Sequence, residues 1–427
     1  MDSKLFAVYF FAVLFVGLFF SLSVAGCDAK REPEIKIEGK FIKDNEHIAP
    51  LPPMGYSTWN EVRFEVSDQL IREVADSMVR TGLRDLGYVY VNIDDGWQGR
   101  RDKEGNLRPD PRKFPHGMKN LVDYIHSRGL KAGIYTDLGK KGCSGRTGSY
   151  GYYQQDADQF AAWGFDYVKV DACGADRMQL DFAEHYAMFA QALKDAAPPR
   201  DILLNICEWG QEQPWKWAPD IGHTWRVGYD IDNQGDYWDG VLYEIDQAVP
   251  HGKIVGLGRF NDLDSLEVGV VSDRRGKKSL TYDESVSNFS MWAILTAPLI
   301  LGLDVTTLDS PGSYSSQFAD IIMNEEVIAV NQDPACIQGR LVAETGLGLQ
   351  IYVKPLGGPS SGERAVVLLN RSETPTRMEV TADHLGLQPG FEVRDLWARE
   401  NKGNNLDSYA DIVPPHGSVM LKISGEN

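Results

Sequence analysis

Short apolar runs rich in β-branched residues alternate with amphipathic stretches along the chain from about residue 51 to residue 330. The runs predict strands at residues 88–93, 131–135, 166–170, 202–206 and 298–301. The stretches have helical periodicity and predict helices at residues 66–81, 118–127, 154–163, 179–196 and 283–295. Strands that alternate with helices of this length indicate βαβ units and a parallel sheet.

Two closures of a parallel sheet fit this pattern: an open, doubly wound sheet and a (β/α)8 barrel. No GxGxxG motif follows the first strand, which disfavours a dinucleotide-binding sheet. Polar residues instead follow the C-terminal ends of many strands, where the loops of a barrel converge around its axis. These residues are Asp94–Asp95, Asp137, Asp171, Cys207–Trp209, Arg226–Asp232, Asp262 and Asp264. The α/β fold class predicted here is therefore a (β/α)8 TIM barrel, over residues 51–338.

The pattern changes from about Gly339 onwards. Short strands are expected at residues 349–353, 364–369 and 418–423, and turns rich in Gly, Pro, Ser and Asn separate them. No convincing helical pattern occurs there. Residues 339–427 are thus predicted to form a C-terminal antiparallel β-sandwich.

The N-terminus has the pattern of an export signal. Lys4 precedes an apolar run over residues 5–22, and small residues follow up to Cys27. The sequence Val24-Ala25-Gly26-Cys27 resembles a bacterial lipobox, which predicts a signal peptide of the lipoprotein type over residues 1–27, a lipidated Cys27 and a polar tether over residues 28–50. The protein would then be a lipoprotein at the periplasm or the cell surface. A plain signal peptide with an incidental cysteine, giving a secreted protein, and an uncleaved anchor remain alternatives.

Composition and charge exclude some classes of function. The 427 residues are 43% hydrophobic and 24% charged, which is ordinary for a globular protein. The formal net charge of −18, without a block of Lys or Arg, disfavours nucleic-acid binding and steering of anionic substrates, whereas a neutral sugar is compatible with it. The sequence has no CxxC or HExxH motif and its eight His do not cluster, so we expect neither a metal nor a cofactor.

Two of the aspartates have a pattern that suits acid–base chemistry. Asp171 ends a buried strand, and Lys169, two positions earlier, points to the same side, where a cation stabilises an ionised carboxylate. Asp230 lies between Tyr229 and Ile231, where partial desolvation would keep it protonated. Retaining glycoside hydrolysis needs such a pair of unlike carboxyls, roughly 5–5.5 Å apart. The alternatives are a structural ion pair at Asp171 and a helix cap at Asp230 or Asp232.

A series of ordered motifs makes the chain from Leu51 to its C-terminus resemble glycoside hydrolase family 27, the family of α-galactosidases and α-N-acetylgalactosaminidases. The matching motifs are PPMGYSTWN (52–60), DDGW (94–97), GIYTD (133–137), YVKVDAC (167–173), CEWG (207–210), RVGYDID (226–232), NDLD (261–264) and VNQDP (330–334).

The resemblance implies a retaining exo-glycosidase that releases terminal α-linked galactose from glycans, with Asp171 as the nucleophile and Asp230 as the acid/base. It also implies roles in sugar binding for further residues. Asp94 and Asp95 would bind the 4- and 6-hydroxyls, and Lys169 would bind the 3,4 side of the ring. The 2-hydroxyl side would be bound by Cys207, Trp209 and Arg226. Trp59 would lie beneath the sugar face, Tyr135 beside the nucleophile and Asp264 beside the acid/base.

The resemblance also implies a disulfide between Cys143 and Cys173. Gly222 and His223 stand where some relatives have a second cysteine that bonds the equivalent of Cys207, so Cys207 is expected to be a free thiol.

The sequence departs from the family pattern at several positions that we expect to line the site. These are Val170, Ala172, Phe260, Leu263 and Ser265. They leave open the same mechanism on β-L-arabinopyranosides or isomaltosyl units, although the pair Asp94–Asp95 favours a hexose with a 6-hydroxyl and the large Trp209 disfavours a 2-acetamido group. A catalytically silent glycan-binding protein is the alternative outside the enzymes, and the presence of both Asp171 and Asp230 weighs against it.

Overall fold

The computed structural model describes residues 46–271, 276–346 and 348–427. The predicted signal peptide, Cys27 and residues 28–45 of the predicted tether lie outside the described residues. Among the helices that are described, none has the length and apolar character needed to cross a membrane.

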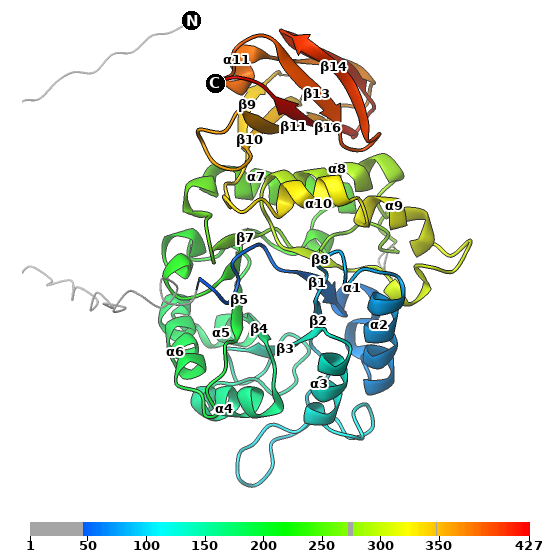
Figure 1. The fold of residues 1–427 in the computed structure, drawn as a ribbon. Helices are drawn as coiled ribbons and strands as arrows, with labels where there is room; N and C mark the ends of the chain where they lie inside the picture. Colours follow the sequence, from blue (N-terminus) through cyan, green and yellow to red (C-terminus); the bar gives the residue numbers. More distant parts are fainter. Residues whose placement is uncertain (1–45, 272–275, 347) are drawn as a thin grey trace, which may run out of the picture. The chain divides into compact units, whose positions relative to one another are not determined.

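Eight parallel strands form a barrel, which confirms the predicted fold class (Figure 1). Neighbouring strands pair in the order β7-β6-β5-β4-β3-β2-β1-β8. The amide N–H of Leu266 donates to the carbonyl of Ile300 at 2.8 Å, and a parallel bridge joins Leu266 to Leu301, so the segment after β7 closes the ring against β8. The strands are β1 (Met54–Ser57), β2 (Tyr90–Ile93), β3 (Lys131–Asp137), β4 (Tyr167–Asp171), β5 (Leu203–Cys207), β6 (Thr224–Arg226), β7 (Phe260–Asp262) and β8 (Leu299–Leu301).

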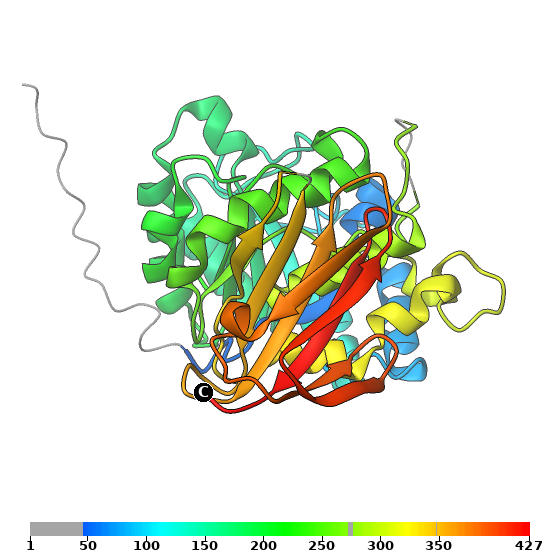
Figure 2. The same cartoon turned by 90° about the horizontal axis from the view of Figure 1, so that it is seen from above.

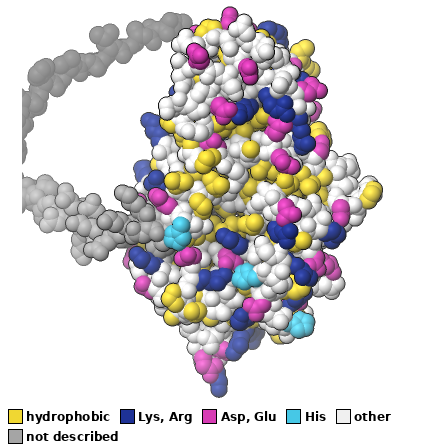
Figure 3. All heavy atoms as spheres, viewed as in Figure 1, with side chains coloured by type: hydrophobic (Ala, Val, Ile, Leu, Met, Phe, Trp, Pro, Cys, Tyr) yellow, Lys and Arg dark blue, Asp and Glu magenta, His cyan; other side chains and the backbone are white. Residues whose placement is uncertain are grey.

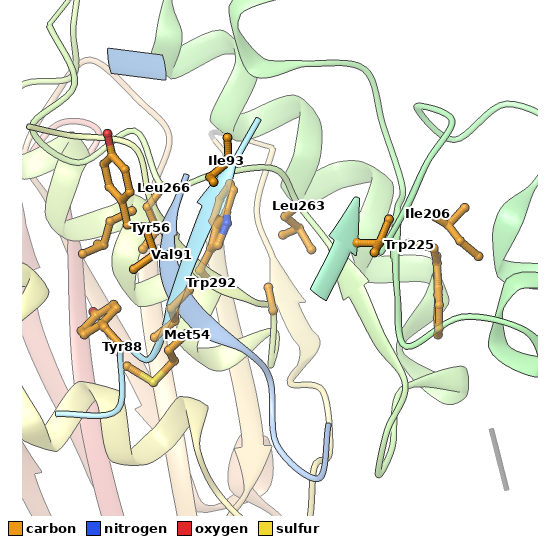
Figure 4. Close-up of a cluster of buried hydrophobic side chains, with 14 of the residues drawn as sticks. Met54, Tyr56, Tyr88, Val91, Ile93, Ile206, Trp225, Leu263, Leu266 and Trp292 are labelled. Atoms are coloured by element: carbon orange, nitrogen blue, oxygen red, sulfur yellow. The ribbon is translucent and has the colours of Figure 1, made fainter. Parts of the chain in front are cut away.

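Amphipathic helices cover the barrel and are fixed by capping side chains at several of their ends. Ser67 accepts from the amide of Leu70 at the start of α2, and Thr281 caps α8 together with Glu284. Figure 4 shows the buried side chains of Met54 and Trp292 beside β1 and β2. The α-helices of this part are α1 (Trp59–Val62), α2 (Asp68–Arg80), α3 (Met118–Ser127), α4 (Tyr153–Trp163), α5 (Cys173–Met178), α6 (Phe182–Lys194), α7 (Tyr237–Ala248), α8 (Tyr282–Ile294), α9 (Ala319–Ile322) and α10 (Glu325–Asn331).

Short 3₁₀ turns connect several of these elements. They are η1 (Arg63–Glu65), η2 (Pro214–Lys216), η3 (Ala218–Asp220), η4 (Ile231–Asn233), η5 (Val249–Ile254), η6 (Val305–Thr307) and η7 (Ser315–Phe318).

The C-terminal part is an antiparallel β-sandwich, as predicted. A six-stranded sheet has the order β14-β13-β16-β11-β10-β9, several of its strands lie side by side in Figure 2, and β12 pairs with β15 in a second sheet. Its elements are β9 (Arg340–Glu344), β10 (Leu349–Pro355), β11 (Glu363–Asn370), β12 (Thr376–Thr381), α11 (Ala382–Leu385), β13 (Phe391–Asp395), β14 (Glu400–Leu406), β15 (Ser408–Val413) and β16 (Ser418–Ser424).

The expectation that the sandwich contains no helix was wrong by one turn. Helix α11 is only four residues long, too short to show helical periodicity in the sequence. It ends at Gly386, whose φ of 63° is the left-handed conformation that glycine adopts readily.

Helix α8 joins the barrel to the sandwich because it contacts β10, β11 and β16. At this junction the fully buried ammonium group of Lys354 donates to the Thr296 hydroxyl at 2.8 Å and to the carbonyl of Val330 at 2.6 Å. Burial lowers the pKa of Lys354 to about 7. The two parts therefore share a buried polar contact, and further hydrogen bonds join them, such as that from the Trp397 indole to the Ser290 hydroxyl at 2.9 Å.

Candidate active site

A cavity of about 340 Å³ opens at the C-terminal ends of the barrel strands. It contains every residue that the sequence predicted for substrate contact except Cys207. The predicted residues that line it are Trp59, Asp94, Asp95, Tyr135, Lys169, Asp171, Trp209, Arg226, Asp230 and Asp264. Because these residues follow or end seven different barrel strands or lie within them, the fold itself brings them together.

Cys207 lies behind the cavity wall rather than on it. It ends β5, its side chain is only 1% exposed, and it is a free thiol, as expected. Burial raises the pKa of the thiol well above its ordinary value. Cys207 therefore supports the wall from behind, as a small uncharged side chain.

Asp171 is the last residue of β4, and its carboxylate is held in place by the backbone. Its Oδ1 accepts from the amide N–H of Ala172 at 2.8 Å. Burial raises the pKa of Asp171 well above its ordinary value, and the ammonium group of Lys169 is the strongest opposing influence. The sequence prediction placed the Lys169 charge near Asp171, yet the ammonium group pairs directly with Asp94, at 2.9 Å from its Oδ2. Lys169 thus forms an ion pair with Asp94 and also lowers the pKa of Asp171.

The loop that follows β3 holds the Asp95 carboxylate through hydrogen bonds. Its two carboxylate oxygens accept from the amide and the hydroxyl of Ser144, both at 2.9 Å. The residue before Ser144 is Cys143, which forms the predicted disulfide with Cys173. Cys173 lies two residues after the nucleophile candidate Asp171. The disulfide therefore ties the loop that orients Asp95 to the strand end that carries Asp171.

The second carboxyl candidate, Asp230, contacts an arginine instead of capping a helix. Nη1 of Arg226 donates to Asp230 Oδ1 at 3.1 Å, and no side-chain cap bond forms at η4. Helix α7 begins after Asp236, so neither Asp230 nor Asp232 caps it. Burial raises the pKa of Asp230, and Arg226 acts in the opposite direction.

Asp264 holds the Asp230 loop from the opposite side. Its Oδ2 accepts from the amide of Ile231 at 3.1 Å and lies 3.2 Å from Nη2 of Arg226. The backbone at Asp264 has φ 70°, which is uncommon outside glycine and places this carboxylate towards Arg226. Asp264 is therefore a positioning residue for the acid/base candidate.

Several cavity residues were not singled out from the sequence. Asn60 and Glu267 meet across the mouth, with the Asn60 amide donating to Glu267 Oε1 at 2.8 Å. Asn60 is the last residue of the motif PPMGYSTWN, a signal that could have identified it. Cys143 and Cys173, predicted only as a disulfide, and Asp232, considered only as a helix cap, also line the cavity. The remaining lining residues are Asp176, Gln211, Tyr229 and Asn233.

The expectation that the departures from the family pattern line the site was wrong for most of them. Val170, Ala172, Phe260 and Leu263 are completely buried in the hydrophobic core and do not border the main cavity. Val170 faces the opposite side of β4 from Lys169 and Asp171, because alternate residues of a strand face opposite sides. Phe260 shares a face of β7 with Asp262 but belongs to a separate buried cluster with Tyr90 and Tyr167. Only Ser265 borders a cavity, a polar space of about 30 Å³ beneath the main one.

One group of side chains has the composition of a metal site. It comprises Asp137, Cys143, Asp171 and Cys173, whose candidate ligand atoms lie within 4.8 Å of one another. The two sulfur atoms are bonded to each other, and Asp137 accepts from the amides of Gly139 and Gly174. Within the described residues this group thus offers two carboxylates that already have other partners, which is a poor fit to a metal ion.

The two carboxyls predict a bell-shaped pH dependence of kcat/KM. Asp171 acts when ionised, so activity rises with pH through its pKa, and Asp230 acts when protonated, so activity falls above its pKa. Because burial raises both pKa values, both limbs are expected above the ordinary aspartate range. In Lys169→Met the acid limb should move to higher pH, because the cation that lowers the pKa of Asp171 is gone.

Initial rates between pH 3 and pH 9 test this prediction, with Lys194→Met on the exposed face of α6 as the matched control. A flat profile between acid and neutral pH, or an acid limb that moves to lower pH in Lys169→Met, would contradict it.

Comparison with known proteins places the chain among α-galactosidases. The family profile described as "Alpha galactosidase A" matches residues 52–333, and that described as "Alpha galactosidase C-terminal beta sandwich domain" matches residues 347–423. The probable alpha-galactosidase of Dictyostelium discoideum is 40% identical over 385 residues, 89% of this chain and 94% of the relative. Alpha-galactosidase A of Cellvibrio japonicus is 38% identical over 403 residues, 89% of this chain and 93% of the relative.

Among solved structures, alpha-galactosidase I from Mortierella vinacea superposes with a TM-score of 0.79 at 33% identity, and the match covers 90% of this chain and 99% of the other.

Proposed function

This chain belongs to the α-galactosidases of glycoside hydrolase family 27, and on that premise we propose that Asp171 and Asp230 carry out its retaining hydrolysis of terminal α-galactosides. The observation that supports this assignment is that both carboxyls line one cavity, each beside a different cation. Lys169 opposes the protonation of Asp171, whereas Asp230 is held by Arg226 and Asp264.

In the first step, Asp171 attacks the anomeric carbon and forms a covalent galactosyl ester. The bond from that carbon to the leaving oxygen breaks, and Asp230 donates its proton to that oxygen. In the second step, ionised Asp230 takes a proton from water, whose oxygen displaces Asp171. Galactose leaves with its original anomeric configuration, and both carboxyls regain their starting protonation states.

The residues that surround the two carboxyls have the chemistry that a galactose site needs. We propose that Asp94 and Asp95 accept from the 4- and 6-hydroxyls, Lys169 binds the 3,4 side, and Trp59 packs against the apolar sugar face. We propose that Trp209 and Arg226 contact the 2-hydroxyl side and that Tyr135 packs beside the nucleophile, since all three line the cavity. Because Asp95 is fixed by Ser144, its orientation is set before the sugar arrives.

A panel of nitrophenyl glycosides tests the sugar preference. We expect kcat/KM for the α-galactoside to exceed that for the β-L-arabinopyranoside, which lacks the 6-hydroxymethyl group, by about 100-fold. Dextran, which presents isomaltosyl units, should not be hydrolysed at a comparable rate. Asp95→Asn should reduce the preference for galactose selectively, and equal rates on both glycosides in the wild type would refute the proposed role of Asp95.

We also propose that the chain is exported, with residues 1–27 as a lipoprotein signal, residues 28–50 as a tether, residues 51–338 as the catalytic barrel and residues 339–427 as the C-terminal domain. The support is the charged start, the apolar run and the lipobox-like sequence that ends at Cys27. Metabolic labelling with palmitate should mark the wild type and not Cys27→Ser, and labelling of both would exclude Cys27 as the modified residue.

A further inference from the structure

A second hollow, a groove of about 660 Å³, lies between the loop that follows β2 and the loop that follows β3. An isolated bridge shapes each loop, joining Gln98 to Pro109 in one and Lys141 to Thr147 in the other. The residues that line the groove are Gln98, Gly99, Arg100, Asp110, Pro111, Arg112, Lys140, Lys141, Gly145, Arg146 and Thr147.

The charge of the groove is opposite to that of the protein. Five of its lining residues are cations and one is an acid, which gives a formal charge of +4 (five minus one) in a chain whose net charge is −18. Elsewhere the two signs are mixed, as on the face drawn in Figure 3. A concentration of one sign in a hollow focuses the electrostatic potential there, so the groove differs from the rest of this acidic surface.

Within the described residues, four of the five cations form no ion pair with an acidic side chain, and three of these four are exposed. Arg112 pairs with Asp110 at 3.0 Å, and the Arg146 guanidinium donates to the carbonyl of Gln98 at 2.8 Å. Arg100, Lys140 and Lys141 are exposed and form no ion pair with any residue that the structure describes. In a protein with 61 acidic residues, exposed cations without an ion pair that gather in one groove are available to an external anion.

The cations of the groove lower the pKa values of two neighbouring titratable groups, Asp110 and Lys113. Hydrogen bonding to Arg112 lowers the pKa of Asp110 to about 2, and Arg146 contributes to this shift. Burial lowers the pKa of Lys113, and Arg146 adds to the decrease. Arg146 is thus a minor contributor to both shifts, behind the pairing of Asp110 with Arg112 and the burial of Lys113.

The loop that follows β3 contributes residues to both the groove and the active-site cavity. The amide N–H of Arg146 donates to the Ser144 hydroxyl at 3.3 Å, and that hydroxyl donates to Asp95 in the cavity. Cys143, from the same loop, lines the cavity and bonds to Cys173. The loop after β3 therefore contributes Cys143 to the wall of the cavity, and Gly145 and Arg146 to the wall of the groove.

We propose that this groove binds an anionic substituent, a carboxylate or a sulfate ester, of the glycan that carries the terminal galactose. This proposal rests on the proposed function, because the hydrolysis of α-galactosides is the reason to expect a glycan as the ligand. Carboxylates and sulfates are the anions that glycans carry, and Arg and Lys side chains bind both. The net charge of the chain disfavours anionic substrates as a class, and the groove is a local exception to that expectation.

The test measures equilibrium binding of the full chain to three polymers of matched length: polygalacturonate for carboxylates, dextran sulfate for sulfate esters, and neutral dextran. We expect one or both anionic polymers to bind, the neutral polymer not to bind, and binding to weaken as ionic strength rises. The variant Arg100→Gln/Lys140→Gln/Lys141→Gln should bind the anionic polymer about tenfold more weakly, because three exposed ion contacts are lost together.

The matched control is Lys194→Gln/Lys216→Gln/Lys253→Gln, which removes three exposed cations outside the groove and changes the net charge equally. Equal weakening in both triple variants, or equal binding of neutral dextran, would overturn the proposal. Hydrolysis of p-nitrophenyl α-galactoside is measured in parallel and should be unchanged in both triple variants. Failure of that hydrolysis in the wild type would count against the proposed function, whereas the polymer binding would still decide the charge preference of the groove.

Discussion

Asp171→Asn is expected to lower kcat/KM for p-nitrophenyl α-galactoside by at least about 1,000-fold, because an amide cannot form the galactosyl ester. The substitution is nearly isosteric, and the new carbonyl oxygen can still accept from the amide of Ala172. Circular dichroism and thermal unfolding should therefore show a folded protein. Initial-rate kinetics on the purified variant measure the loss.

Asp137→Asn is the matched control for this variant. Asp137 ends β3, directly beside Asp171 in the register of β3 and β4, yet it does not line the cavity. Its loss should reduce kcat/KM by less than about tenfold, since it contributes no reacting group. Wild-type activity in Asp171→Asn would refute the nucleophile assignment. In Asp171→Gly, added azide should restore turnover and give the β-galactosyl azide, because it attacks from the face that the carboxylate vacated.

Asp230→Asn is expected to lose activity in proportion to how much the leaving group needs a proton. With raffinose-type or other alkyl α-galactosides, kcat/KM should fall by about 100- to 10,000-fold. With 2,4-dinitrophenyl α-galactoside, galactosylation should remain fast, because that leaving group departs without protonation. The second step then lacks its base, so a burst of dinitrophenol should precede a slow steady state.

Azide supplies the independent readout for Asp230→Asn. It needs no general base, so it should speed the second step and give the α-galactosyl azide, with the original configuration. Asp232→Asn, from the same cavity wall but paired with Arg63, is the control and should show no burst. If Asp230→Asn lowers kcat/KM by the same factor for substrates with good and with poor leaving groups, Asp230 is not the general acid.

The sequence pattern predicted the longer barrel elements closely. The helix expected at 118–127 has those bounds, and the strands expected at 131–135 and 202–206 differ by one or two residues at an end. Strands β1, β6 and β7 were not predicted as strands, because each is short and mixes polar with apolar residues (MGYS, TWR and FND), whereas the equally short β8 (LIL) lies in an apolar run. Such a short run shows no periodicity, and its pairing with neighbours far away in the chain defines it.

The site was predicted to the extent that its residues lie at strand ends. Lys169 and Asp171 follow from the alternation of a strand, and Asp94 and Asp95 from their place after β2. The family resemblance, rather than any local pattern, singled out Trp59 and the disulfide. The sequence did not reveal Ser144, because its contact with Asp95 joins residues 49 positions apart. The burial of Phe260 and Leu263 away from the cavity was also not predicted, because it depends on contacts with residues far away in the chain.

The joint at which the barrel closes, between β7 and β8, has a consequence for how the protein loses activity on heating. Strands β7 and β8 meet through the short segment that ends at Leu266, and that segment carries Asp264, which steadies Asp230. A local opening of this joint would detach the proton donor from its support while the remaining strands stay paired. Amide hydrogen exchange at Leu266 should therefore be faster than in β3 or β4, and gentle heating should inactivate the protein below the temperature at which its ellipticity is lost.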